Sequence, residues 1–302
     1  MSRATDLTEA VIAVPRQRVA RGTIESLRER LAADLAPVAA AVSRGGPLVV
    51  TLPLLCRAQA RSTVVLPDDA FVWRPFFVRR SLGAAIVDEC LRGRHRSPAE
   101  VARTVLDDAI ANWRRTGARS FHWEPWVAGL PPGGRANVLA EAVTWATALW
   151  SSFDWSAFPD RPVVGGPTEQ WTTPEAPGVR LTSRTDLRVR ASRSSDGRDG
   201  SDPLALVSVL NGAPSPPGSA VLAYPAMVAA LRAPWRGPPS RSVGVWPDAG
   251  HVESIDVDAA ALEAAADLVV ETSVRWSQVA MPALSGPEVV RADPSAKVAA
   301  AS

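Results

Sequence analysis

The chain has 302 residues, of which 46% are hydrophobic and 21% charged, so it can bury a sizeable core and is not disordered throughout. Its 33 basic and 31 acidic side chains give a net charge of +2, so any nucleic-acid surface must come from local clustering of charge. No apolar run approaches the ~20 residues of a membrane span, and the two cysteines form no disulfide framework, which predicts a cytoplasmic protein with no membrane partner.

The first part of the chain has the apolar spacing of a helix. Leucines recur at every fourth position from Leu27 to Leu35, which predicts a helix that is capped by Thr23 and kinked or ended by Pro37. The apolar run over residues 48–55 is either a strand or the beginning of a helix. We therefore expect an N-terminal extension with one helix over residues 1–46.

A capping box marks a further helix. Ser97 is a natural N-cap, Pro98 suits the first turn and Glu100 lies three residues after the cap, so a helix is predicted to begin here. Other elements expected nearby are helices over 80–91 and 135–150 and a turn over 130–134. This part of the chain is therefore expected to form a helical lobe.

From about residue 161 the pattern changes to strands. Residues 179–190 alternate, with small or apolar side chains on one face and Asp186 among arginines on the other. Residues 204–210 are apolar on both faces, which predicts a buried strand. The remaining expected elements are a loop over 192–202, a helix over 219–231, a strand over 242–246, a helix from Asp258 to about Val279 and a disordered tail over 281–302.

Five stretches together resemble a known family: Leu181–Val189 around Asp186, Leu206–Gly212, Val221–Tyr224, Trp246–Gly250 and Ser81–Val87. They are similar to the RecB-like branch of the PD-(D/E)xK nuclease superfamily, in particular the single-domain type found in actinobacteria. Val87 stands where a helix of that family carries a metal-binding histidine. The resemblance implies an α/β fold with a restriction-endonuclease-like mixed central sheet flanked by helices. It implies one domain over residues 47–280, with a helical part over about 47–160 and a sheet core over about 161–280.

The family's chemistry uses carboxylates on adjacent strands to hold Mg²⁺, with a lysine two residues after the second acid. The resemblance makes Asp186 the metal-binding aspartate and places Glu169 at the upstream acidic position. Ser208 stands where the family has its second acid and Leu210 where it has its lysine, and Lys297 is the only lysine of the chain. A serine hydroxyl and a leucine side chain cannot supply the charge that this chemistry needs.

We therefore expect a degenerate nuclease-like protein that binds DNA or a DNA-processing partner without cleavage, with no cofactor, or with Mg²⁺ if activity remains. Whether it is an enzyme stays open. One alternative is an active Mg²⁺-dependent exonuclease or endonuclease with a rearranged site of Asp186, Glu169 and Asp202. Another is a protein–protein interaction module. For Asp186 itself, the alternative to a metal ligand is a structural carboxylate paired with Arg184 or Arg188.

Arginines provide the candidate nucleic-acid contacts. Those on the strand of Asp186 are Arg180, Arg184, Arg188 and Arg190. They are expected to contact phosphates, and the alternative is an exposed sheet face of mixed charge. The cluster Trp73–Arg80 mixes aromatic and arginine side chains, so it is expected either to stack on single-stranded bases or to pack in the core.

Overall fold

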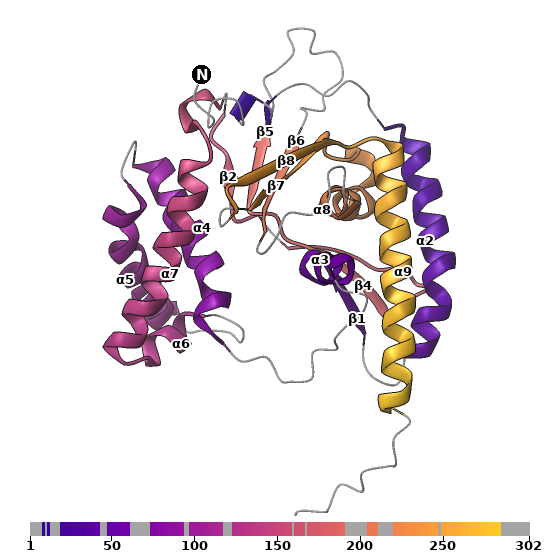
Figure 1. Ribbon diagram of the computed structural model, residues 1–302, viewed down its shortest axis with the longest axis horizontal. Helices are drawn as coiled ribbons and strands as arrows, with labels where there is room; N and C mark the ends of the chain where they lie inside the picture. The colour runs from indigo at the N-terminus through magenta and orange to yellow at the C-terminus, as the bar shows by residue number, and fades with distance from the viewer. Residues whose placement is uncertain are drawn as a thin grey trace, which may run out of the picture.

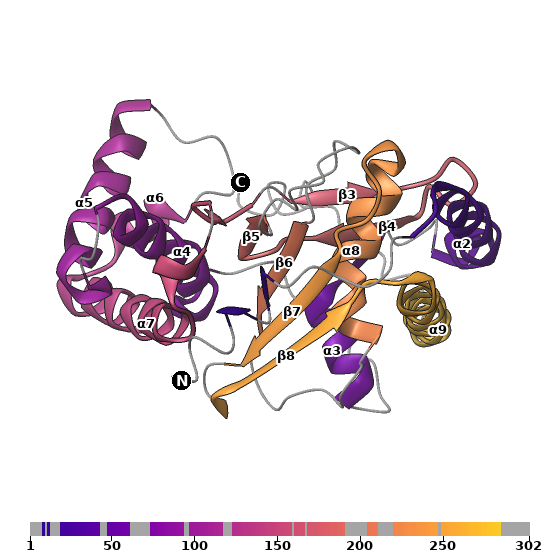
Figure 2. The ribbon, with the colours of Figure 1, turned by 90° about the horizontal axis from the view of Figure 1, so that it is seen from above.

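Helices lie on both sides of the strands in the computed structural model (Figures 1 and 2). The structure describes residues 8–9, 11–12, 19–42, 47–60, 73–93, 97–116, 123–158, 160–166, 168–190, 204–210, 220–246 and 249–284. The helices are α2 (Arg21–Val42), α3 (Leu52–Ala60), α4 (Pro75–Arg92), α5 (Pro98–Thr116), α6 (Glu124–Gly129), α7 (Pro132–Ser151), α8 (Ala220–Arg232) and α9 (Ala259–Leu284), with 3-10 turns η1 (Trp155–Ala157) and η2 (Pro234–Arg236). The strands are β1 (Leu48–Thr51), β2 (Val163–Val164), β3 (Glu169–Trp171), β4 (Val179–Ser183), β5 (Leu187–Arg190), β6 (Leu204–Val209), β7 (Arg241–Trp246) and β8 (His251–Asp256).

These strands form two mixed sheets. The first has the order β1-β4-β3, with β1 parallel and β3 antiparallel to β4. The second has the order β2-β5-β6-β7-β8, in which β6 and β7 are parallel and the other pairs are antiparallel. Helix α8 joins β6 to β7, because parallel neighbours need a crossover connection. The mixed α/β fold with a helical N-terminal region is thus confirmed, with its strands divided between two sheets.

The expected continuous strand over residues 179–190 is two strands in different sheets. β4 ends at Ser183 and β5 begins at Leu187. The side chains of Thr185, Asp186 and Leu187 are all buried, whereas the predicted alternation would expose that of Asp186. The chain therefore bends at this point. Asp186 lies in the interior and not on the exposed arginine face where the alternation placed it.

Strand β6 separates two hydrophobic clusters. Ala205, Val207 and Val209 lie in a cluster with α4, α5 and α7, whereas Leu206 lies in a cluster with α2, α8 and α9. Figure 2 shows these two groups of helices on opposite sides of the second sheet. The prediction that the strand over residues 204–210 is buried on both faces is confirmed.

Several predicted helices form with shifted ends. The helix of the N-terminal leucines begins at Arg21, so Thr23 lies inside it, and it continues through Pro37 to Val42. Helix α7 begins at Pro132, so the prediction of a turn over residues 130–134 is wrong for its last three positions. The apolar run over 48–55 is predicted to be either a strand or the beginning of a helix, and it is both in turn: β1 is followed directly by α3.

Side-chain contacts mark the beginnings of two predicted helices. The backbone N–H of Ser97 donates to Glu100 Oε2 at 3.3 Å, which is one half of a capping box before α5. Asp258 accepts a hydrogen bond from the backbone N–H of Ala261 at 2.7 Å and thereby caps α9. Helix α9 continues to Leu284; the expected loop over 192–202 and the rest of the tail lie outside the described residues.

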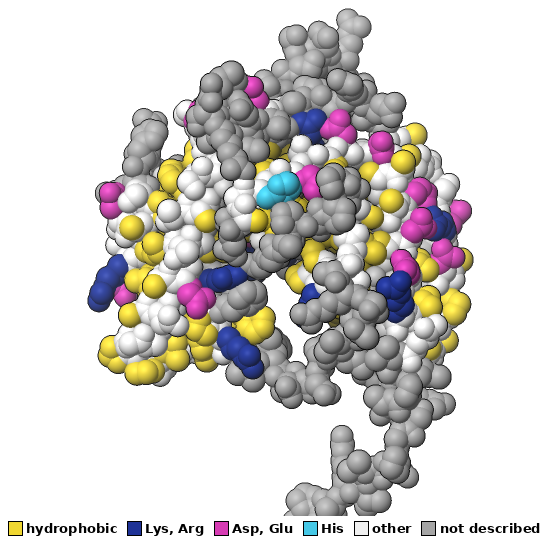
Figure 3. Space-filling model, viewed as in Figure 1, with side chains coloured by type: hydrophobic (Ala, Val, Ile, Leu, Met, Phe, Trp, Pro, Cys, Tyr) yellow, Lys and Arg dark blue, Asp and Glu magenta, His cyan; other side chains and the backbone are white. Residues whose placement is uncertain are grey.

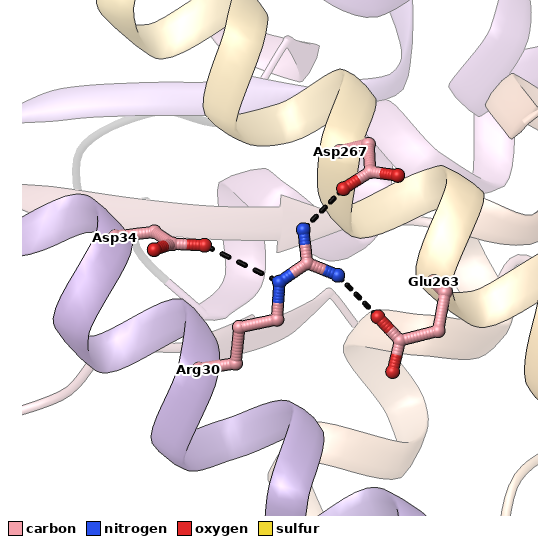
Figure 4. Close-up of polar contacts among 4 residues, drawn as sticks. All are labelled: Arg30, Asp34, Glu263 and Asp267. Carbon is pink, nitrogen blue, oxygen red and sulfur yellow. Dashed lines mark hydrogen bonds and ion pairs between the residues drawn. The ribbon is translucent and has the colours of Figure 1, made fainter.

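Helices α2 and α9 lie side by side (Figures 1 and 2). Arg30 of α2 contacts Asp34 of its own helix at 3.3 Å and also pairs with Glu263 and Asp267 of α9 (Figure 4). Figure 3 shows acidic and basic side chains gathered along this edge of the molecule. None of the helices in the described ranges is long and apolar enough to cross a membrane.

Candidate functional site

Asp186 occupies the bend between β4 and β5, and its side chain is only 3% exposed. Its backbone N–H donates to the carbonyl of Val207 at 2.9 Å, and its carbonyl accepts from the N–H of Gly165 at 2.8 Å. Its carboxylate Oδ2 accepts from the backbone N–H of Val209 at 2.6 Å. If β5 began two residues earlier, a carbonyl there would satisfy that N–H, so here the carboxylate takes the place of a ladder acceptor from β5.

Arg80 of α4 holds the same carboxylate with two donors. Its Nε donates to Asp186 Oδ1 at 2.5 Å and its Nη2 to Oδ2 at 2.8 Å. Nη2 also donates to the carbonyl of Arg184 at 2.9 Å. This two-point pairing is the strong form of an arginine–carboxylate contact. The ion-pair partner of Asp186 is therefore a residue of the helical lobe and neither of the two strand arginines, Arg184 and Arg188, considered from the sequence.

A second guanidinium lies near this ion pair. Partial loss of solvent around Arg184 lowers its pKa, the nearby charge of Arg80 lowers it further, and Asp186 raises it. Arginine nevertheless stays charged in proteins. Arg80 therefore holds the buried carboxylate directly, and the charge of Arg184 lies close enough to act on the same pair.

Glu169 of β3 is similarly held. It stands opposite Ser183 in the β3–β4 register, and its side chain is 12% exposed. Arg188 of β5 donates from Nη2 to Glu169 Oε1 at 2.6 Å, and Nη1 of Arg232, at the end of α8, lies 3.9 Å from the same oxygen. The structure thus pairs a predicted catalytic residue, Glu169, with a predicted phosphate contact, Arg188. The ion pair between Glu169 of β3 and Arg188 of β5 therefore links the two sheets.

Several residues within these ion pairs or next to them in the chain have buried polar atoms without hydrogen-bond partners. Within the described residues they include Ser183 Oγ, Thr185 Oγ1 and Arg188 Nε. A Cβ atom added at Gly166 would lie 2.8 Å from Arg188 Nε and 3.5 Å from Thr185 Oγ1, so these groups converge beside that glycine. Unsatisfied buried polar groups are rare in proteins, and two of these three lie beside Gly166.

Ser208 and Leu210 lie inside the protein. Ser208 is 3% exposed and stands opposite Gly244 in the β6–β7 register. Leu210 packs in the cluster that contains α8, and its N–H donates to the carbonyl of Val245 at 2.7 Å. Both flank Val209, whose N–H binds Asp186. Neither supplies a charge to the carboxylate beside it.

The donor set does not favour a metal ion. Across the described part of the chain, no group of three or more His, Cys, Asp or Glu side chains is arranged to hold one. Both oxygens of Asp186 already accept hydrogen bonds from Arg80 or Val209. Magnesium prefers six oxygen ligands in nearly ideal octahedral geometry, which one carboxylate committed to a guanidinium does not provide.

The two cysteines do not supply a nucleophile at neutral pH. Burial raises the pKa of the Cys56 thiol to about 11 and that of the Cys90 thiol to about 11. The reactive form of cysteine is the thiolate, so both remain largely inert at neutral pH.

The four strand arginines do not form one continuous face, because β4 and β5 belong to different sheets. Arg180 of β4 stands opposite Val49 of β1, Arg188 is paired with Glu169, and Arg190 is exposed at the end of β5. Arg184 instead lies next to Arg80, whose Nη2 donates to the Arg184 carbonyl. In the sequence, Arg80 stands out only as part of the mixed aromatic and arginine cluster Trp73–Arg80.

Arg80 and Arg232 are the residues that the sequence analysis missed in this site. They reach Asp186 and Glu169 from α4 and α8. Arg80 is separated from Asp186 by 106 positions, and no pattern in the sequence couples the two. No protein-family model matches the chain, and no curated protein matches it.

Proposed function

We propose that the chain is a divergent nuclease-like protein of the PD-(D/E)xK type that binds nucleic acid and does not cleave it. The observation that carries this proposal is the state of Asp186, a buried carboxylate at the start of β5 whose oxygens are taken by Arg80 and by the N–H of Val209. A nuclease of this type needs that carboxylate for a metal ion that activates water. Here a guanidinium occupies it.

The strand order supports the same proposal. β5 runs antiparallel to β6, and β6 connects through α8 to the parallel strand β7. This is the order of elements on which the resemblance rests: a strand with an acid, a buried strand, a helix and a further strand. Ser208 of β6 and Leu210, directly after it, flank the N–H that binds Asp186, and the resemblance equates them with the family's second acid and lysine.

The charge balance favours a phosphate over a cation. Arg80 pairs with Asp186, the charge of Arg184 lies nearby, and Arg188 and Arg232 approach Glu169, so arginines outnumber carboxylates around this site. A site that holds divalent metal has the opposite balance. Guanidinium groups are the usual contacts to a nucleic-acid backbone. In this proposal the arginine side chains attract the phosphate, as the metal ion does in an active nuclease.

The test compares cleavage and binding on the same preparations. With Mg²⁺ or Mn²⁺, we expect no hydrolysis of linear duplex or single-stranded DNA above a protein-free control. With EDTA, we expect binding to persist and its logarithm to fall linearly with the logarithm of salt concentration, by about 0.7 to 0.9 per phosphate contact. Cleavage that is abolished in Asp186→Asn would overturn the proposal and favour the active nuclease with a rearranged site.

A matched pair of arginine variants locates the binding. Arg184→Ala is expected to weaken binding and to reduce the salt slope by about 1. Arg103→Ala removes an exposed arginine from α5, where its side chain is 85% exposed and contacts Asp107 only loosely at 3.8 Å. It should leave both quantities unchanged. Equal effects of the two substitutions would show that binding is a property of net charge and not of this site.

A further inference from the structure

The 3-10 turn η2 presents a tryptophan to solvent. Trp235 is 69% exposed, the highest value among the exposed large hydrophobic side chains of the described residues. Pro234 begins the turn, and the N–H of Arg236 donates to the carbonyl of Ala233 at 2.9 Å. Gly237 ends it with a φ of +69°, which favours glycine. The local backbone therefore holds the ring outward from the end of α8.

Positive charge flanks this ring. Arg232 and Arg236 lie on either side of Trp235 in the chain, and both are exposed. Arg28 of α2 donates to the carbonyl of Leu231 at 2.6 Å, which adds a further guanidinium at the end of α8. The side chain of Arg236 forms no hydrogen bond or ion pair within the described part of the chain. It is available to an anion from outside.

The turn is connected to the site through Glu169. Nη1 of Arg232 lies 3.9 Å from Glu169 Oε1, which also accepts from Arg188 at 2.6 Å. Arg188 in turn lies beside Gly166 and Thr185, next to Asp186. Arginines thus extend from the Asp186 ion pair to the exposed ring of Trp235.

We propose that Trp235, Arg232 and Arg236 form a stacking subsite for an unpaired base of a single-stranded nucleic acid. An exposed indole with two exposed arginines within three positions of it in the chain offers a flat apolar face to a base and donors for the adjoining phosphates. A duplex keeps its bases stacked on one another, so it can use the arginines but not the ring. An acidic polypeptide would likewise pair with the arginines and gain little from the ring. The inference rests on the nucleic-acid binding proposed above and adds its strand preference.

The experiment measures three anionic probes by fluorescence anisotropy in EDTA at low salt: labelled oligothymidylate, a duplex of equal length and labelled poly-glutamate. Trp235→Ala is expected to weaken oligothymidylate binding between about 5-fold and about 150-fold, the range for one base–aromatic stack. Duplex binding should change less than twofold. Trp235→Phe should recover most of the lost affinity, because it restores an aromatic face.

Control variants separate stacking from general effects. Val274→Ala removes an exposed apolar side chain from α9 and should change no affinity. Unchanged oligothymidylate binding by Trp235→Ala would overturn the subsite while leaving the proposed function intact. Equal losses for oligothymidylate and duplex would also overturn it. Wild-type protein that binds poly-glutamate but neither DNA would refute both proposals and identify an acidic protein as the partner.

Discussion

At the scale of single residues, the contacts of Asp186 show how a charged carboxylate can be buried next to β6. The bend at residues 184–186 removes β5 from the ladder before Val209, so the N–H of Val209 needs another acceptor. The carboxylate provides it and keeps its remaining capacity for Arg80. Burying a charge is costly unless it is paired and hydrogen-bonded, and here both conditions are met.

Asp186→Ala is expected to lower the free energy of unfolding by about 3 kcal/mol, because it leaves a guanidinium and a buried N–H without an acceptor. Asp186→Asn retains an oxygen for Val209 and should lose less. Urea denaturation followed by circular dichroism measures both. The control Glu25→Ala breaks an exposed pair with Arg21 on α2 and should cost below about 1 kcal/mol. A loss no larger in Asp186→Ala than in this control would contradict the structural role of the ion pair.

At the scale of elements, Tyr224 joins α8 to the first sheet. Its hydroxyl donates to the carbonyl of Val50 on β1 at 2.6 Å and accepts from the N–H of Thr182 on β4 at 3.0 Å. The side chain is fully buried, and burial raises the pKa of the phenol well above its usual value. A protonated hydroxyl is therefore required wherever α8 packs on these two strands.

The alkaline titration of Tyr224 tests this contact. Because the phenol pKa is raised on folding, its contribution to stability is complete below the unfolded value of about 10 and is lost above it, by up to about 1.4 kcal/mol per pH unit. Tyr224 is the only tyrosine, so the absorbance at 295 nm, taken as the difference from Tyr224→Phe with the same eleven tryptophans, reports its phenolate. We expect that signal to appear together with unfolding. Phenolate formation in the folded protein near pH 10 would contradict the burial.

Tyr224→Phe separates the hydrogen bond from the packing of the ring. It should destabilise the neutral protein by about 1–3 kcal/mol, because the N–H of Thr182 loses its acceptor. The variant should also lose the part of the alkaline destabilisation that Tyr224 causes. Urea midpoints at neutral pH and at alkaline pH, compared with those of wild type, measure the two effects.

Gly244 lets α8 approach the second sheet closely. A Cβ atom there would lie 2.6 Å from both Leu222 Cδ2 of α8 and the ring of Trp246. Gly244→Ala is expected to destabilise the protein by about 1–3 kcal/mol through overpacking. Gly22→Ala is the matched control, because a Cβ at Gly22 in α2 meets no atom within 4 Å and alanine favours a helix. Thermal melts in which the two variants shift in the same direction would contradict this account.

Elements with strong local patterns could be predicted from the sequence, and those that depend on distant pairing could not. The capping box before α5 and the apolar run of β6 are visible over a few neighbouring residues. Strands β2 and β3 are only two and three residues long and exist through pairing with β5 and β4. The bend at 184–186 was missed because small or apolar residues continue to alternate through it.

The same distinction holds for the candidate site. The resemblance directed attention to Asp186 and Glu169, and the structure assigns both to ion pairs. The identity of their partners depends on how α4 and α8 pack, which no local spacing encodes. Nothing in the sequence sets Trp235 apart from the other tryptophans, because its exposure follows from the turn after α8.

At the scale of the whole molecule, α2 and α9 pack side by side although they lie far apart in the chain. Both helices contribute to the cluster that also contains β1 and α8. Arg30 adds polar contacts to Glu263 and Asp267 at the rim of this packing (Figure 4). The helix expected as an N-terminal extension therefore shares its core with residues more than 200 positions later.

Arg30→Ala should cost only about 1 kcal/mol, because the groups involved are partly exposed and exposed ion pairs contribute little. The difference from wild type should shrink in high salt, which screens surface charges. Urea denaturation at low and high salt measures it. A loss of several kcal/mol that salt does not reduce would mean that the aliphatic part of Arg30 supports the packing of α2 and α9.

The position of β6 has a consequence for how the molecule comes apart. Strand β6 contributes side chains to both hydrophobic clusters: Val207 packs in the cluster of α4, and Leu206 packs in the cluster of α8. Each hydrophobic cluster lacks part of its side chains without β6, so the two halves of the molecule are not independent folding units. Heating should melt them in one step, and a fragment ending before β6 should stay insoluble unless the missing piece is supplied in trans.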